Sequence, residues 1–172
     1  MRFMKRALEL AQIAFNEGEV PVGAVIVCDE LIVAEGYNQT EFLLDPTAHA
    51  EILAIREACD LLGNWRLSNC TLYTTLEPCA MCAGAILQAR LKKVVWAAPD
   101  IRCGGGGSWI NVLDGGFEIH KVEVEKGLLA DEASQLMKNF FKERRNARGD
   151  DRAAKSQAVE IGAGNHPSFD KR

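Results

Sequence analysis

The sequence predicts an α/β fold in which helices cover both faces of one mixed five-stranded sheet, a three-layer α/β/α arrangement. Three observations lead to this prediction. The 172 residues suffice for one domain with its own core. The 48% hydrophobic and 26% charged residues are typical of a globular protein. Segments of helical and strand periodicity alternate along the chain, and no internal repeat interrupts them.

The first half of the chain is expected to form a helix, a β-hairpin and a second helix. Apolar residues recur at helical spacing from Met4 to Phe15. Two β-branched segments then follow, separated only by Asp29 and Glu30, which is typical of a hairpin. A polar stretch precedes a new helical pattern, for which Thr47 is the expected cap. The expected elements are a helix at 2–18, strands at 20–28 and 31–37, a loop at 38–46 and a helix at 47–63.

The second half is expected to alternate strands and helices before a last helix. Pro78 suits the first position of a helix, and four successive glycines require a loop. The expected elements are a strand at 71–75, a helix at 78–89, a strand at 94–98, a loop at 100–108, a strand at 117–124 and a helix from 129 to about 148. Residues 149–172 mix both charges with small residues and predict a mobile tail, so the domain is expected to span residues 1–148. A short helix near 153–159 is the alternative for part of this tail.

Charge and hydropathy narrow the class of protein. A net charge of -4 argues against a positive charge over the whole surface, but not against a local basic patch. The longest apolar runs are too short to span a membrane, and the basic residues near the N-terminus precede a helical pattern instead of a secretory signal. We therefore expect no membrane partner and a cytoplasmic location, where the six cysteines are reduced thiols or metal ligands.

Three residues at two expected helix starts have the types and the spacing of metal ligands. Cys79 and Cys82 stand at i and i+3, so that both sulfurs can reach one point, and a helix N-terminus favours thiolates. His49 stands in the first turn of another expected helix and offers a nitrogen. Two thiolates and an imidazole suit Zn²⁺, and three protein ligands leave a fourth position open, as in catalytic sites. The pattern predicts one zinc ion per subunit.

Glu51 is the predicted catalytic residue. It converges with His49 only if the histidine lies at an irregular helix start, because residues two apart do not share a helix face. A carboxylate beside zinc-bound water can take its proton and pass it to a substrate nitrogen. His-x-Glu combined with Pro-Cys-x-x-Cys resembles the known signature of zinc-dependent nucleobase deaminases. Two other interpretations stay open: a redox pair, and a structural zinc site that would take its fourth ligand from Cys28, Cys59, Cys70 or Cys103.

With these motifs, the chain resembles the bacterial tRNA-specific adenosine deaminases, which have the cytidine deaminase-like fold. The resemblance covers nearly all of residues 1–148 and rests on four stretches: 19–25, 45–51, 75–85, and Phe140-Phe141 with Arg144-Arg145. It implies hydrolysis of adenosine to inosine at the wobble position of an arginine tRNA with the anticodon ACG. It further implies attack by a zinc-activated hydroxide on C6 of adenine, proton transfer to N1 by Glu51, and a homodimer.

The resemblance also implies which residues contact the flipped base. Asn38 matches a residue that hydrogen-bonds the base, although an asparagine after a strand is equally typical of a turn. Val22 would line the pocket, although it also suits a buried strand, and the backbone N–H of Ala50 would help to fix the substrate. Asp100 and Arg102 belong to a loop that departs from relatives by an extra glycine, while Arg102 keeps a positive charge. We expect glycines 104–107 to form a flexible rim beside the site.

The last expected helix is the predicted RNA contact. Residues 138–148 hold five basic residues and one acidic residue, a local charge of +4. Phe140 and Phe141 offer stacking surfaces for unpaired bases, while Arg144 and Arg145 suit phosphates. The alternative is a terminal helix with its phenylalanines in the core and a solvated basic face. The family resemblance favours the anticodon stem-loop of a tRNA as partner, with no DNA partner expected.

Two other functions remain in view. A deaminase of a free base, nucleoside or nucleotide, of the guanine or cytosine type, would use the same zinc chemistry. A zinc-stabilised binding module without catalysis would use the same ligands but would not need the carboxylate of Glu51.

Overall fold

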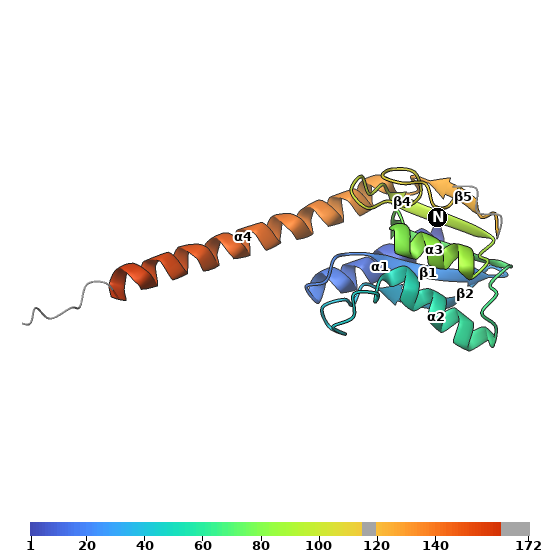
Figure 1. Cartoon of the computed structure of the whole chain (residues 1–172), viewed down its shortest axis with the longest axis horizontal. Helices are drawn as coiled ribbons and strands as arrows, with labels where there is room; N and C mark the ends of the chain where they lie inside the picture. The colour runs from blue at the N-terminus through green and yellow to red at the C-terminus, as the bar shows by residue number, and fades with distance from the viewer. Residues whose placement is uncertain (115–119, 163–172) are drawn as a thin grey trace, which may run out of the picture. The chain divides into compact units, whose positions relative to one another are not determined.

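The computed structural model describes residues 1–114 and 120–162, of which 148–162 are described by their backbone alone. The described elements follow one another as helix, hairpin, helix, strand, helix, two strands and helix (Figure 1). They are α1 (Arg2–Asn16), β1 (Gly23–Cys28), β2 (Leu31–Tyr37), α2 (Ala50–Leu62), β3 (Cys70–Leu76), α3 (Ala80–Gln88), β4 (Lys93–Ala98), β5 (Glu123–Lys126) and α4 (Ala130–Gly162).

One five-stranded sheet organises these elements. Its strand order is β2-β1-β3-β4-β5. Strand β1 pairs antiparallel with both β2 and β3, whereas β3–β4 and β4–β5 are parallel pairs. The predicted mixed sheet of five strands is therefore confirmed. Parallel neighbours require crossovers, and α3 supplies the one between β3 and β4.

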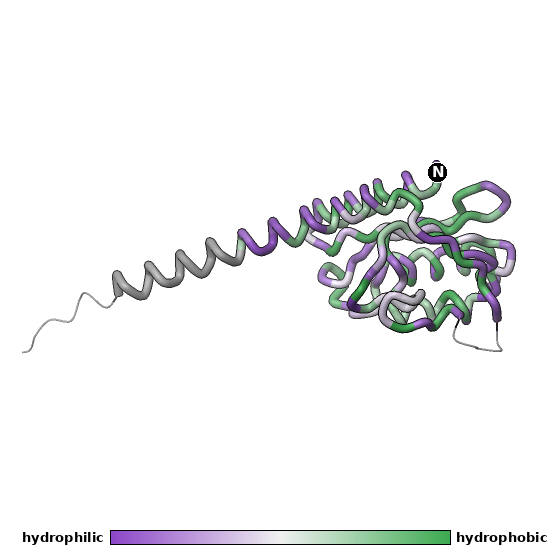
Figure 2. Tube along the Cα trace, turned by 90° about the horizontal axis from the view of Figure 1, so that it is seen from above, coloured by the Kyte–Doolittle hydropathy of each residue, from purple (hydrophilic) through white to green (hydrophobic). Residues whose placement is uncertain are grey.

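Apolar residues of β1 alternate between two core clusters, one on each face of the sheet. Ala24 and Ile26 pack in the cluster that contains residues of α2 and α3, while Val25 and Val27 pack in the cluster that contains residues of α1. Figure 1 shows α2 and α3 beside each other on one face of the sheet. Hydrophilic and hydrophobic residues alternate along the turns of α1 (Figure 2), as expected for a helix with one buried face. The predicted three layers follow from this alternation.

A glycine in β2 brings α2 close to the sheet. A Cβ atom at Gly36 would meet the backbone of α2, lying 2.9 Å from the nitrogen of Ala54 and still closer to the carbonyl oxygen of Ala50. Only glycine permits this approach. The first turn of α2 is thereby fixed against the sheet, and this turn carries two of the predicted site residues.

Both helices at the predicted metal centre start later than expected. Thr47 does not cap α2, because its N–H and hydroxyl bond to the Asp45 carboxylate at 2.8 and 2.7 Å, and His49 is the cap residue. Pro78 does not open α3, because Cys79 is the cap residue and Ala80 is the first helical residue. Helix α2 ends at Gly63, as predicted, and this glycine has a left-handed backbone with φ 61°.

The C-terminal part differs most from the prediction. Helix α4 continues to Gly162, beyond the expected end near 148, and includes the alternative helix at 153–159. The chain divides into two compact units, Met1–Met137 and Lys138–Arg172. Residues 117–119 of the expected strand at 117–124 lie outside the described residues, as do residues 163–172 of the expected tail. The observed strand β5 begins only at Glu123 and ends at Lys126. Among the described helices, none combines the length and the apolar character that a bilayer crossing requires.

Candidate metal centre

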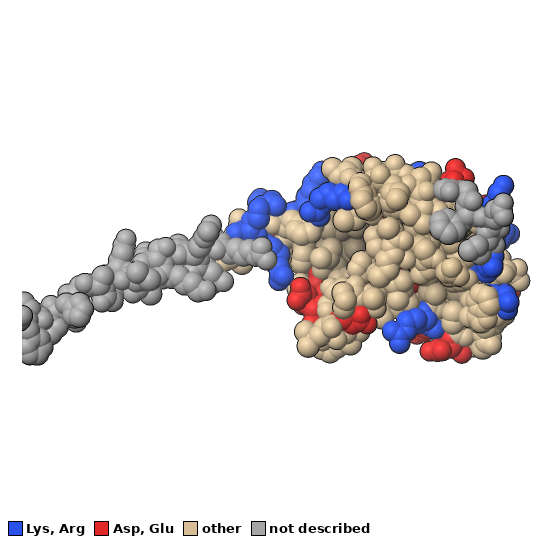
Figure 3. All heavy atoms as spheres, in the orientation of Figure 1, with Lys and Arg blue, Asp and Glu red and all other residues tan. Residues whose placement is uncertain are grey.

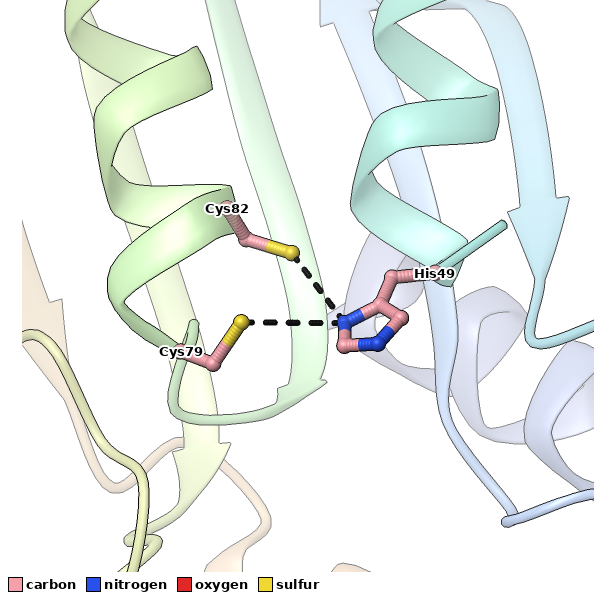
Figure 4. A group of neighbouring side chains, drawn as sticks. All are labelled: His49, Cys79 and Cys82. Atoms are coloured by element: carbon pink, nitrogen blue, oxygen red, sulfur yellow. Dashed lines mark hydrogen bonds between the residues drawn. The ribbon is translucent and has the colours of Figure 1, made fainter. Parts of the chain in front are cut away.

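The three predicted ligands meet where two helices begin. His49 precedes α2, Cys79 precedes α3, and Cys82 lies in the first turn of α3; their side chains point toward one another in Figure 4. Both cap residues have extended backbone, with ψ angles of 150° and 173°. This conformation directs the side chains ahead of the helices and into the space between them.

The distances within this group fit a tetrahedral zinc ion. The Nδ1 atom of His49 lies 3.7 Å from the sulfur of Cys79 and 3.5 Å from the sulfur of Cys82. Typical zinc–sulfur and zinc–nitrogen bonds at a tetrahedral angle separate sulfur and nitrogen by about 3.6 Å. Within residues 1–114 and 120–147, whose side chains the structure describes, the side chains that could hold a metal together are these three. The geometry thus leaves the fourth position open, which does not favour a closed structural site.

Electrostatics within the group favour a negative charge on sulfur. The pKa of Cys79 is lowered to about 4, mainly by its hydrogen bond with Cys82. Burial alone would raise this pKa, and a further hydrogen bond with His49 lowers it. The pKa of Cys82 is raised by its hydrogen bond with Cys79 and by burial. The hydrogen bond with Cys79 also raises the pKa of His49. A thiolate is thus present at neutral pH, and metal binding would displace the remaining protons.

Glu51 is buried in the first turn of α2, next to this group. Only 3% of its surface is exposed. Burial raises the pKa of Glu51 to about 7, against the smaller lowering effects of its own backbone N–H, His49 and Cys82. The required irregular helix start is present, because His49 lies outside the helix and Glu51 inside it. A carboxyl group that titrates near neutral pH can both accept and release a proton.

A second buried glutamate, Glu77, holds the glycine-rich loop beside Cys79. Its carboxylate accepts hydrogen bonds from the backbone N–H groups of Asp100, Gly106 and Ser108, each at 3.0 Å. Burial alone would raise the pKa of Glu77, but hydrogen bonds from Ser108, Asp100 and Gly106 outweigh it and hold the pKa below its usual value.

The glycine-rich loop is therefore packed, and its prediction as a flexible rim was wrong. Gly104, Gly105 and Gly106 are buried. A Cβ atom at Gly104 would lie 2.5 Å from the carboxyl carbon of Glu77, and one at Gly106 would enter the ring of Trp96. The N–H of Gly105 also bonds to the carbonyl of Pro78 at 2.7 Å. The glycines serve close packing beside Cys79, which a reading of glycine as conformational freedom misses.

A third buried glutamate, Glu19, orients Asn38. Its carboxylate accepts a hydrogen bond from the Asn38 amide nitrogen at 3.0 Å and from the hydroxyl of Thr40 at 3.2 Å. It also accepts bonds from the backbone N–H groups of Glu41 and Phe42 at 2.9 and 2.8 Å. Asn38 is only 5% exposed, so it is not simply a surface turn residue. Glu19 and Glu77 lie within the stretches 19–25 and 75–85 that carry the family resemblance, but the sequence alone predicted no role for either.

The other predicted substrate residues of the first unit are in part buried beside β1 and α2 and in part placed in an exposed turn. Val22 is buried just before β1, and Ala50 is the buried first residue of α2. The Asp100 carboxylate accepts the backbone N–H groups of Arg102 and Cys103 at 3.0 and 3.3 Å, forming a turn. Arg102 is exposed in this turn. Nothing in this arrangement tests their contact with a substrate.

The predicted RNA residues lie in the second unit, on α4. Phe140 is buried and Phe141 half-buried, and their rings meet edge to face with centroids 5.4 Å apart. The Arg144 guanidinium lies 5.6 Å from the Phe140 ring centroid, and Arg144 and Arg145 are exposed. In Figure 3, basic side chains gather on α4, next to the grey C-terminal part on the left of the picture. Of the two phenylalanines, Phe141 is therefore the more accessible.

The open three-ligand cluster and the buried carboxyl at the starts of two helices define a class of metal-dependent hydrolases, the zinc-dependent deaminases. The chain belongs to the family described as the cytidine and deoxycytidylate deaminase zinc-binding region, which matches residues 1–98. The fold prediction and the predicted family resemblance are confirmed.

The relatives identify a branch of this family. The chain is 49% identical over 145 residues to the tRNA-specific adenosine deaminase of Haemophilus influenzae, covering 84% of both chains. It is 49% identical over 144 residues to the enzyme of that name from Aquifex aeolicus, covering 84% of this chain and 95% of that one. It matches the chloroplastic tRNA(adenine(34)) deaminase of Arabidopsis thaliana at 47% identity over 155 residues, but spans only 12% of that protein.

Solved structures agree with this placement. A structure from a study of A-to-I editing by tRNA:A34 deaminases has a TM-score of 0.76 and 41% identity, and the match covers 78% of this chain and 98% of that one. A guanine deaminase from Nitrosomonas europaea has a TM-score of 0.70 and 30% identity, over 80% of this chain and 82% of that one.

Replacing either cysteine of the cluster should remove the metal. In Cys79→Ala or Cys82→Ala, affinity for zinc is expected to fall by more than about 100-fold, because even the loss of a group that supports a ligand costs about 10–100-fold. Zinc content after dialysis, measured by plasma mass spectrometry, checks this. Cys103→Ala, at an exposed cysteine, is the matched control and should keep its zinc. Stoichiometric zinc in either cluster variant would contradict the ligand assignment.

Glu77→Gln should lower stability in a pH-dependent way. At pH 7, the variant is expected to lose about 1–3 kcal/mol of unfolding free energy, because an amide cannot accept the same set of N–H donors. The pKa of Glu77 is lowered from 4.5 in the folded protein, so its carboxylate stabilises the fold above pH 4.5 and stops doing so as the pH falls through the folded-state pKa.

The difference between the two proteins should therefore shrink below pH 4.5. Urea unfolding from pH 7 to pH 3.5 measures it. Glu123→Gln, at an exposed carboxylate of β5, should stay within about 0.5 kcal/mol of the parent protein. A difference for Glu77→Gln that does not change with pH would contradict the role given to the charge.

Proposed function

We propose that this chain hydrolyses adenosine to inosine at the wobble position of an arginine tRNA with the anticodon ACG. The observation that carries the proposal is the buried Glu51 carboxyl beside the His49, Cys79 and Cys82 cluster. Relatives named tRNA-specific adenosine deaminases, at 49% identity over most of both chains, support the choice of substrate.

Glu51 would move the protons of this reaction. Zinc bound by the cluster would act as a Lewis acid and lower the pKa of water, so that attack on C6 of adenine becomes feasible at neutral pH. Glu51, whose pKa burial raises to about 7, would accept a proton from the attacking water and deliver one to N1 of the base. The remaining proton of the added hydroxyl would pass through Glu51 to the C6 amino group, which would leave as ammonia, and inosine would remain.

Asn38 and the helix starts would position the flipped base. The Asn38 amide nitrogen is held by Glu19, and no hydrogen bond of its Oδ1 atom to the described residues is seen, so this oxygen can accept a bond from the substrate. The backbone N–H of Ala50 belongs to the positive end of α2, which suits a developing negative charge. Val22, Asp100 and Arg102 complete the proposed substrate contacts.

Phosphates of the anticodon stem-loop would be bound by α4. Arg144 and Arg145 are exposed there, and Phe141 is more accessible than Phe140 for stacking against an unpaired base. Such binding should weaken as salt concentration rises, because each phosphate contact releases counterions.

Deamination of a free base is the second candidate. It is favoured by the match to the guanine deaminase of Nitrosomonas europaea at a TM-score of 0.70. The cluster and Glu51 would serve either substrate.

An RNA assay separates the two candidates. Zinc-loaded protein incubated with the ACG anticodon stem-loop should yield inosine at the first anticodon position, with no ammonia from free guanine, cytosine or adenosine. Arg144→Ala/Arg145→Ala should weaken RNA binding and reduce the salt slope by about 0.7 for each lost contact to single-stranded RNA. The matched control is Arg66→Ala/Lys92→Ala, which removes the same charge near the start of β3 and β4. Deamination of free bases without inosine formation would establish the second candidate instead.

Glu51→Gln should abolish most turnover and keep the metal. We expect kcat to fall by about 100-fold or more, because general acid–base catalysis typically contributes about 10²–10⁴-fold. Inosine formation and zinc content are measured on the same preparation, with Glu9→Gln, at an exposed carboxylate of α1, as the control. Unchanged turnover would contradict the catalytic role of Glu51, whereas no turnover in either protein, with zinc bound, would indicate a non-catalytic zinc-stabilised module.

Four further expectations stay predictions: one zinc ion per subunit, a homodimer, a cytoplasmic location without a DNA partner, and a mobile tail at 149–172. The surface that we propose for a second copy is a groove of about 500 Å³, which four aliphatic residues line together with Arg56, Glu57 and Asp60. Sedimentation of the zinc-loaded protein tests the dimer.

A further inference from the structure

Two cysteines face each other on neighbouring strands, away from the metal centre. Cys28 is the last residue of β1, Cys70 is the first residue of β3, and the two are register partners in the antiparallel pair. Strand β3 has seven residues and spans about 20 Å, and Cys79 follows its far end. The cysteine pair therefore lies at one end of strand β3, and the metal cluster lies beyond the other end.

The backbone shows which kind of antiparallel pair this is. The Cys70 N–H donates to the carbonyl of Leu67 at 2.9 Å, and the Cys70 carbonyl accepts from the N–H of Lys92 at 3.0 Å. A hydrogen-bonded antiparallel pair exchanges both of its N–H groups, and the Cys70 N–H is used for Leu67, so the two cysteines form a non-hydrogen-bonded pair. In such pairs the Cα atoms lie about 4.5 Å apart and the side chains stand close together on one face. Disulfides bridge Cα separations of about 4.4–6.8 Å, so the backbone needs little movement to allow a bond.

A surface cavity gives small molecules access to this pair. The cavity has a volume of about 310 Å³, and both Cys28 and Cys70 line it. Cys28 is half-buried, whereas Cys70 is 2% exposed. Arg66 also lines the cavity and offers a positive charge to an anionic reagent.

We propose that Cys28 and Cys70 form a reversible dithiol site that a small-molecule disulfide closes to an intramolecular disulfide. The thiolate of Cys28 attacks one sulfur of the reagent, whose S–S bond breaks and releases one thiolate. The thiolate of Cys70 then attacks the Cys28 sulfur of the mixed disulfide and releases the second thiolate. The two protein thiols lose two electrons and two protons, and the reagent is reduced to two thiols.

The order of attack follows from exposure. Burial raises the pKa of the Cys70 thiol to about 12, and the adjacent Cys28 thiol adds to this rise. Cys70 is therefore a poor first nucleophile and acts on a neighbour already activated by the reagent. Cys59 is the nearest competitor, but its thiol is directed to the carbonyl of Trp65 at 3.8 Å. Closure would link the two strands and enclose the intervening chain, which stabilises mainly by restricting the unfolded state.

Peptide mapping after equilibration with glutathione tests the proposal. Zinc-loaded Cys103→Ser protein, which lacks the exposed cysteine, is equilibrated with increasing ratios of oxidised to reduced glutathione, quenched in acid and alkylated. Mass spectrometry should find the Cys28 and Cys70 peptides linked, in a fraction that rises with the ratio and reverses on reduction. The linked form should melt at a higher temperature than the reduced form. Cys59→Ser in the same background should give the same link, and Cys28→Ser should give none.

Three results would overturn the proposal. One is a link between Cys28 and Cys59, another is a glutathione adduct on Cys28 that Cys70 never displaces, and the third is full alkylation of both thiols at every ratio. Because the mapping identifies each linked peptide, it can also be carried out on the parent protein, so it decides the question even if a serine variant fails to fold.

Discussion

The structure depends on the meeting of two helix N-termini at one end of the sheet. His49 and Cys79 both occupy the cap position, and neither uses its side chain to cap its own helix. Their side chains are instead directed toward each other, while the positive ends of the two helices favour negative charge between them. At this meeting point, hydrogen bonds with Cys82 and then with His49 lower the pKa of Cys79.

Two buried carboxylates hold the loops that flank this meeting point. Glu77, which follows β3, holds the glycine-rich loop by accepting hydrogen bonds from two of its N–H groups. Glu19, which follows α1, holds residues 38–42 in the same way. A buried carboxylate is costly unless several N–H groups bond to it, and both glutamates meet this condition. The loops are therefore set in place by the folded chain before any substrate arrives, which lowers the cost of ordering them during binding.

The spacing of apolar residues along the sequence predicted most of the fold, and the sequence motifs predicted the metal cluster. Periodicity located the helices and strands, because burial on one face imposes it. The predicted first residues of α2 and α3 were wrong. Thr47, for example, has the residue type preferred for a helix cap, but it bonds to Asp45 instead. The roles of Glu19 and Glu77 were missed because most of their partners are backbone N–H groups, which carry no residue type. The glycine loop was misread because a missing side chain indicates either freedom or close contact, and only the neighbouring Glu77 and Trp96 decide between them.

The cluster and Glu51 are a general device, and substrate choice must come from their surroundings. A guanine deaminase shares this fold at a TM-score of 0.70 and 30% identity, so the common scaffold does not by itself separate a free base from a base within RNA. What differs must act on the base, whose amino group stands at C2 in guanine and at C6 in adenine, and on the ribose, phosphates and neighbouring bases. In this chain, the features suited to that task lie outside the cluster: the loop held by Glu19, the loop held by Glu77, and the basic, aromatic part of α4. Under the proposed function, chemistry and selection would be carried by separate parts of the chain, and either could change while the metal centre keeps its geometry.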